Sequence, residues 1–147
     1  MANIIKTFHT SEHRFLSNFW PCTVNYGALT YRSAEAAYQA HKCLDLNERG
    51  KFTTMQPGEA KRAGKHYHRP DWDEMKLDVM RCVVWAKFTQ NQALTLKLLA
   101  TGQARLEEGN YWHDRFWGVC PVGSGKGLNH LGQILMDVRR QLSKKET

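Results

Sequence analysis

The central helix is predicted by the stretch Ser33-Ala-Glu-Ala-Ala-Tyr-Gln-Ala-His-Lys-Cys-Leu-Asp45. Ser33 is a typical N-cap residue, because its hydroxyl can accept a hydrogen bond from a free N–H group of the first turn. Alanine, the strongest helix former, follows at positions 34, 36, 37 and 40. The stretch is therefore expected to be helical, with a small apolar face suited to close packing.

The same helix carries a polar face made of Glu35, Tyr38, Gln39 and Lys42. These positions are spaced i, i+3, i+4 and i+7, which places them on one side of a helix. The face spans about 10 Å along the axis, so the long side chains at its two ends can reach one small ligand. The pattern fits either an ordinary solvated surface or a catalytic face, and the rest of the sequence favours the second.

Size and composition are those of an ordinary globular protein. The chain has 147 residues, 41% of them hydrophobic and 24% charged, which predicts one domain over residues 1–147. Its four cysteines form no C-x-x-C pair, so they indicate reduced thiols rather than a zinc site. The N-terminus lacks the apolar core of a signal peptide, and we therefore expect a cytoplasmic protein.

The balance of charge is basic. A formal net charge of +7 favours anionic partners such as nucleic acid, nucleotides or phosphorylated metabolites. Part of it lies in a cluster of lysine, arginine and histidine at residues 61–69. That cluster fits a solvated face somewhat better than an anion site.

Turn and cap signals predict the other elements. Residues 22–31 have the pattern of a hairpin with a turn at 25–27, and residues 104–108 that of a strand. Helices are expected over residues 57–63, 71–88, 92–101 and 130–142. Asp71 and Glu74 have the spacing of a capping box at the start of the longest of these helices.

Two aromatic stretches are unusual for loops, namely Phe15-Leu-Ser-Asn-Phe-Trp-Pro21 and Tyr111-Trp-His-Asp-Arg-Phe-Trp-Gly-Val-Cys120. The first fits a hydrophobic plug over the core or a wall that stacks on a flat heterocycle. The second fits aromatic packing with a salt-bridged Asp114 or an aromatic pocket that contains a second acidic group. Gly123-Ser-Gly-Lys-Gly127 then precedes the last helix, where backbone N–H groups can bind phosphate. It is not a Walker A loop, because Cys120 stands where the first glycine belongs.

Together these motifs resemble the NADAR family, also called YbiA-like N-glycosidases. The matching stretches are 15–21, 31–35 with Tyr38, Gln39 and Lys42, 112–114 with Trp117 and Gly118, and 127–132 with Leu135, Met136 and Arg139. The resemblance implies a compact, mostly helical α+β fold with a small antiparallel sheet. It also implies hydrolysis of an N-glycosidic bond, in early riboflavin-pathway intermediates or in ADP-ribose attached to guanine of nucleic acid.

A mechanism follows from the chemistry of that bond. Its cleavage builds positive charge on the ribose, which a carboxylate stabilises while it activates water. Glu35 is the first candidate for this role and Asp114 the second. Lys42 either orients Glu35 by its charge or attacks the opened sugar to form a Schiff base. The scheme needs no metal and no cofactor.

The residues expected to bind substrate come from several motifs. They are Asn18, Phe19, Trp20, Arg32, Tyr38, Gln39, Trp85, Trp112, Trp117, Gly118, Gly125, Lys126 and Asn129. The expected partners are ADP-ribosylated guanine in nucleic acid or a phosphoribosyl small molecule, without a membrane. Association with an ADP-ribosyltransferase toxin is a further implication of the resemblance. The alternatives to an enzyme are a non-catalytic nucleotide or nucleic-acid binding module and a purely structural interaction domain.

Overall fold

The computed structural model describes residues 3–145. Its contacts divide the chain into two compact units, one formed by residues 18–92 and the other by the flanking segments up to residue 17 and from residue 93 onward. The single domain expected over residues 1–147 stays a prediction. The two units are described in turn.

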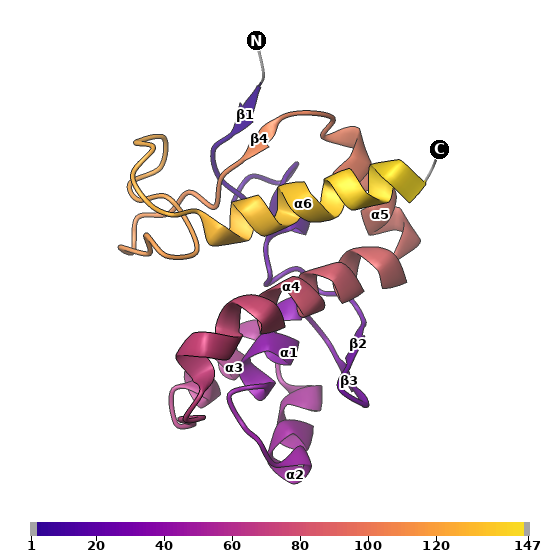
Figure 1. The fold of residues 1–147 in the computed structure, drawn as a ribbon, viewed down its shortest axis with the longest axis vertical. Helices are drawn as coiled ribbons and strands as arrows, with labels where there is room; N and C mark the ends of the chain where they lie inside the picture. The colour runs from indigo at the N-terminus through magenta and orange to yellow at the C-terminus, as the bar shows by residue number, and fades with distance from the viewer. Residues whose placement is uncertain (1–2, 146–147) are drawn as a thin grey trace. The chain divides into compact units, whose positions relative to one another are not determined.

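The unit of residues 18–92 is mainly helical (Figure 1). Its elements are the strands β2 (Val24–Tyr26) and β3 (Leu29–Tyr31), the helices α1 (Ala34–Ala40), α2 (Leu46–Gly50), α3 (Pro57–Gly64) and α4 (Trp72–Gln90), and the 3-10 helix η2 (Lys51–Thr54). Helix α1 packs against α3, α4 and η2, and all seven of its residues are buried. Its alanines allow this close approach on several sides, as the sequence predicts.

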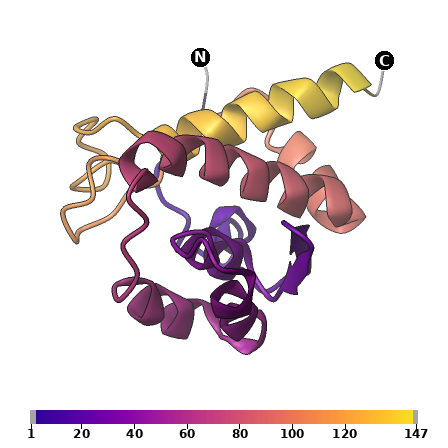
Figure 2. The same cartoon turned by 60° about the horizontal axis from the view of Figure 1, so that its bottom comes forward.

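The strands β2 and β3 form the predicted hairpin as an antiparallel pair, which Figure 2 shows beside α1. The turn was predicted at residues 25–27, which is wrong by one to two positions. It consists of Gly27 and Ala28, with φ angles of 58° and 72°, the backbone of a two-residue hairpin turn. Asn25 instead belongs to β2, where it pairs with Thr30.

The other unit contains the two chain ends. Its elements are β1 (Ile4–Ile5), the 3-10 helix η1 (Arg14–Leu16), α5 (Gln92–Ala100, which begins at the boundary), β4 (Arg105–Leu106) and α6 (His130–Lys145). Strands β1 and β4 pair in parallel, and α6 packs against β4 (Figure 1). Arg139 fixes α6 further, because its guanidinium donates to Thr101 Oγ1 at 2.8 Å and to Ala104 O at 2.7 Å.

The predicted α+β class is confirmed, with helices forming most of the regular structure. The sheet is more divided than expected: one strand pair is antiparallel and the other parallel. Within residues 3–145, no helix has the length and apolar character that a membrane span requires.

Candidate active site

Glu35 lies in the first turn of α1 and is only 7% exposed. Ser33 caps the helix as predicted, since its Oγ accepts a hydrogen bond from Ala36 N at 3.0 Å. The backbone of Glu35 is held by Asn18, whose carbonyl accepts from Glu35 N at 3.0 Å. The candidate carboxylate is therefore buried and tied to the first aromatic stretch.

Gln39 orients the Glu35 carboxylate from one turn further along α1. Its Nε2 donates to Glu35 Oε1 at 3.0 Å, and the side chain is 5% exposed. Gln39 Oε1 is buried without a hydrogen-bond partner among the described residues. A Cβ atom at Gly64 would lie 1.9 Å from this oxygen, so a larger residue there would displace the Gln39 amide from its present position. The Gln39 amide therefore holds Glu35 through its Nε2, while its Oε1 has no donor among the described residues.

The predicted helix ends earlier than the sequence indicates. Ala40 is the last residue of α1, and His41 and Lys42 form a turn in which Lys42 N donates to Gln39 O at 3.1 Å. Lys42 therefore lies in the turn just beyond α1, and its place on the same face as Glu35 stays a prediction.

Lys42 is nevertheless coupled to Glu35 through its charge. Partial burial lowers the pKa of the Lys42 ammonium, and this effect exceeds the opposing attraction of the Glu35 carboxylate. The charges of Lys65, Lys61 and Lys76 lower the same pKa further. Both effects favour the neutral amine, the form that acts as a nucleophile.

His41, which no sequence motif marks as a site residue, is 4% exposed. Its Nδ1–H donates to Ala37 O at 2.8 Å, and its ring lies 4.4 Å from that of Tyr26. Burial lowers the pKa of His41 to about 4, and the positive charges of Arg49 and Arg69 act in the same direction. A single histidine after an alanine-rich helix forms no sequence pattern that predicts its burial or its lowered pKa.

His41 should make the protein sensitive to acid. In the unfolded chain its pKa is near the ordinary value of about 6.5, so between that pH and 4 the unfolded state binds more protons. His41 should therefore contribute a loss of about 3 kcal/mol in stability as the pH is lowered from 7 to 4. Urea unfolding at both pH values measures this loss. His41→Asn should lose much less between the two pH values, whereas His66→Gln, at an exposed histidine, should retain the wild-type loss.

The first aromatic stretch contributes both buried and exposed groups. Asn18 is 8% exposed, and its Nδ2 contacts Met80 Sδ at 3.2 Å, a weak acceptor. Phe19 is 42% exposed, with the ammonium of Lys61 over its ring at 5.9 Å.

Trp20 and Trp85 are half-buried, and Arg32 is exposed. Tyr38 packs on Trp72 with ring centroids 5.1 Å apart.

Asp114, the second candidate carboxylate, organises its own loop. Its Oδ1 accepts hydrogen bonds from Phe116 N at 3.1 Å and Trp117 N at 2.9 Å. The loop is also fixed by Asn110, which is fully buried and bonds to the backbone of Asp114 through both ends of its amide. These contacts explain Asp114 as a turn-forming residue, and a catalytic role for it stays a prediction.

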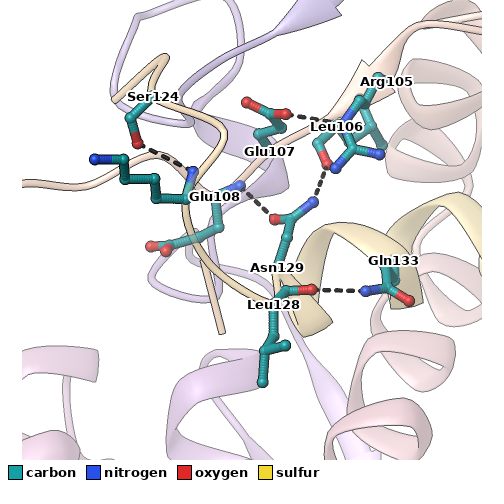
Figure 3. Close-up of polar contacts among 9 residues, drawn as sticks. Arg105, Leu106, Glu107, Glu108, Ser124, Leu128, Asn129 and Gln133 are labelled. Atoms are coloured by element: carbon teal, nitrogen blue, oxygen red, sulfur yellow. Dashed lines mark hydrogen bonds and ion pairs between the residues drawn. The ribbon is translucent and has the colours of Figure 1, made fainter. Parts of the chain in front are cut away.

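Asn129 holds the start of α6 against the chain that follows β4. Figure 3 shows its Oδ1 accepting from Glu108 N at 3.0 Å and its Nδ2 donating to Leu106 O at 2.9 Å. The residue is 1% exposed. Both ends of the predicted substrate-binding amide are therefore used within the protein.

The N-terminus of α6 was expected to present N–H groups to phosphate. Instead, Asn129 N, His130 N and Leu131 N donate to carbonyl groups of residues 116–118. The glycine-rich loop is held to the segment before it, with Lys126 O accepting from Cys120 N at 3.0 Å. Gly125 and Lys126 are exposed. Phosphate binding by this loop stays a prediction. The first N–H groups of α6 are not available for it, because they are already bonded within the protein.

The second aromatic stretch is split between surface and packing. Trp112 is 50% exposed and contacts His9 at 5.2 Å between ring centroids. Trp117 packs edge-on against Phe116 at 4.8 Å. Gly118 is buried, and a Cβ atom there would lie 2.0 Å from Glu108 O, which accounts for glycine by close backbone approach.

The predicted residues thus form two sets, one in each unit. Glu35 and Gln39 touch directly, Asn18 bonds to the Glu35 backbone, and Lys42 is coupled to Glu35 by charge. In the other unit, the Asp114 carboxylate holds the backbone of Trp117.

Among residues 3–145, no three histidine, cysteine or acidic side chains are grouped as metal ligands.

The comparison with protein families confirms the resemblance noted in the sequence. The model of the NADAR domain matches residues 7–143. This chain belongs to the NADAR family. Its α+β fold is also that of a solved NADAR relative: the NMR structure of the Escherichia coli protein YbiA superposes with a TM-score of 0.84 at 34% identity, covering 99% of this chain and 89% of that one.

Curated relatives carry names that describe N-glycosidases. N-glycosidase YbiA of Escherichia coli is 37% identical over 147 residues, which cover 95% of this chain and 89% of the relative. An N-glycosidase of Nostoc punctiforme is 34% identical over 134 residues. A riboflavin biosynthesis protein of Vibrio vulnificus is 39% identical over 135 residues, but this NADAR chain spans only 36% of its length. These names support N-glycosidase activity in the NADAR family.

Proposed function

We propose that this NADAR protein is an N-glycosidase that removes ADP-ribose from guanine in nucleic acid. The observation that carries the proposal is the buried Glu35 carboxylate, held by Gln39 Nε2 at 3.0 Å and coupled by charge to Lys42. A buried carboxylate stabilises a developing oxocarbenium ion more strongly than one in solvent. The relatives named N-glycosidases support the reaction class.

In this proposal Glu35 does the acid–base work. As the C1′–N bond lengthens, its negative charge faces the positive charge that grows on C1′, and one of its oxygens takes a proton from the attacking water. Gln39 keeps the other oxygen in place, which limits the carboxylate to one orientation. The neutral fraction of Lys42 is available for attack on the opened sugar.

Charge supports nucleic acid as the carrier of the substrate. The net charge of +7 would attract a polyanion, and the exposed Phe19 and Trp112 offer faces for stacking on bases. A partner that attaches ADP-ribose to guanine, such as an ADP-ribosyltransferase toxin, would supply the substrate. The second candidate substrates are phosphorylated intermediates of riboflavin biosynthesis, favoured by the name of the Vibrio vulnificus relative.

Mass spectrometry separates these substrates. The protein is incubated with DNA that carries ADP-ribosylated guanine and, separately, with the phosphorylated riboflavin intermediates. Release of free ADP-ribose and restoration of unmodified guanine is the expected result. Hydrolysis of the riboflavin intermediates alone would replace the proposed substrate with the second one. Binding of both without any hydrolysis would indicate a non-catalytic binding module.

A further inference from the structure

A cavity of about 280 Å³ lies within the unit of residues 18–92, beside Lys42. We call it the basic pocket. It is lined by Lys42, Gly64, Lys65, Tyr67, His68, Arg69, Pro70, Trp72 and Asp73. Of these residues, only Lys42 belongs to the site expected from the sequence. Most of the lining comes from the basic segment 61–69, which the sequence indicates more as a solvated face.

The charge of the basic pocket favours an anion. It is lined by Lys42 and Lys65, by Arg69, which is ion-paired with Asp71, and by one carboxylate, that of Asp73. That carboxylate is already paired, since Lys76 Nζ lies 3.3 Å from Asp73 Oδ1. The neighbouring lysines lower the pKa of Lys42, which shows that their charges act on one another. A bound anion would relieve this repulsion.

Arg69 is held in place for such a role. Its Nε donates to Asp71 Oδ1 at 2.6 Å, and its Nη1 donates to His41 O at 3.2 Å. The sequence predicts Asp71 as the cap of α4, but its side chain makes no cap hydrogen bond and binds Arg69 instead. Arg69 Nη2 also donates to Asp71 Oδ2 at 3.3 Å, so the guanidinium is fixed in one orientation. One N–H of Nη1 and one of Nη2 have no partner among residues 3–145, and a phosphate can accept from them with little loss of conformational entropy.

The size and position of the basic pocket indicate which part of the substrate it holds. The volume lies just below the range of roughly 300–1,000 Å³ that is usual for pockets of small molecules, so it suits a phosphate group and a sugar edge better than a whole dinucleotide. Trp72 lines the basic pocket and packs on Tyr38 of α1. Lys42 lines it too and is coupled to Glu35. An anion in the basic pocket would therefore lie next to the sugar on which Glu35 acts.

We propose that the basic pocket binds the phosphate ester carried by the ribose whose N-glycosidic bond is cleaved. The identity of this ligand rests on the proposed function. Both candidate substrates have such a phosphate, as a diphosphate in ADP-ribose and as a monophosphate in the riboflavin intermediates. The basic pocket takes the role that the sequence suggests for the loop at Gly123 to Gly127.

Lys65→Gln tests the proposal, because Lys65 is exposed at the end of α3 and its loss should leave the chain folded. Binding of inorganic pyrophosphate, measured by calorimetry at low salt, should weaken about tenfold, the scale of one charged hydrogen bond. KM for the phosphorylated substrate should rise by a similar factor, with kcat changed much less. Lys51→Gln is the matched control, since it removes the same charge from an exposed site outside the basic pocket. It should bind pyrophosphate like the wild type.

The outcomes separate this inference from the proposed function. Three outcomes would overturn the proposal for the basic pocket, even with hydrolysis intact. They are wild-type pyrophosphate binding in Lys65→Gln, equal weakening in Lys51→Gln, and loss of binding only in Lys126→Gln. Selective weakening in Lys65→Gln supports it, even if no N-glycoside is hydrolysed and the proposed function fails. Titration with ADP-ribose and with ribose 5-phosphate then distinguishes a diphosphate from a monophosphate ligand.

Discussion

Glu35→Gln is expected to lower the turnover of the N-glycoside by at least about 100-fold, the usual scale for a lost acid–base group. The substitution keeps the shape of the side chain and an oxygen for Gln39 Nε2, which donates to Glu35 Oε1 at 3.0 Å in the native protein. It removes only the charge that stabilises the oxocarbenium-like state. Substrate binding should change much less than turnover, because the charge on C1′ develops after binding.

The control for this experiment is Glu74→Gln, the same chemical change at an exposed position of α4. It should retain wild-type turnover. Asp114→Asn, which keeps an oxygen for Phe116 N and Trp117 N, tests the second carboxylate without opening its turn. Wild-type turnover in a folded Glu35→Gln variant would falsify the assignment. A 100-fold loss confined to Asp114→Asn would transfer the catalytic role to that residue.

Lys42→Ala is expected to lower turnover on a similar scale of about 100-fold, and borohydride should trap a sugar on Lys42 during turnover. The expectation rests on the lowered pKa of the Lys42 ammonium, in which burial outweighs the Glu35 charge. In the trapped step the C1′–O4′ bond opens and O4′ takes a proton, the Lys42 amine bonds to C1′, and the base leaves C1′ with a proton from the amine, which gives a C=N bond. Borohydride then delivers hydride to this bond and leaves a stable secondary amine. Mass spectrometry of the digested protein locates the adduct.

The pH dependence and a conservative variant complete this test. If the neutral amine attacks, the rate should rise as the pH increases through the lowered pKa of Lys42. Lys42→Arg, which retains a positive charge but no nucleophilic amine, should then be nearly as inactive as Lys42→Ala. Substantial activity in Lys42→Arg without an adduct would leave Lys42 with an electrostatic role. Full activity in Lys42→Ala would remove it from the site.

Local sequence rules predicted the elements well where the signal was local. The cap at Ser33, the hairpin of residues 22–31 and the helix at 57–63 follow from residues that interact within one or two turns. The end of α1 at Ala40 did not follow from the sequence, because it depends on the tertiary contacts of His41. Its ring packs on Tyr26, and Arg69 binds its carbonyl group. Those partners are distant in sequence and left no periodic pattern near His41.

In the candidate site, too, some features follow from the local sequence and others from tertiary contacts. The sequence by itself determined the family and the α+β class, and it made Glu35, Gln39 and Lys42 candidates, since these inferences depend on motifs and short spacings. The tertiary structure alone decided that Asn129 and Asp114 bond to the backbone, that Gln39 approaches Gly64, and that Arg69 faces a cavity with Lys42. The physical reason is that burial, desolvation and hydrogen bonds between distant segments arise only when the chain packs, whereas propensity and spacing are already present in the unfolded chain.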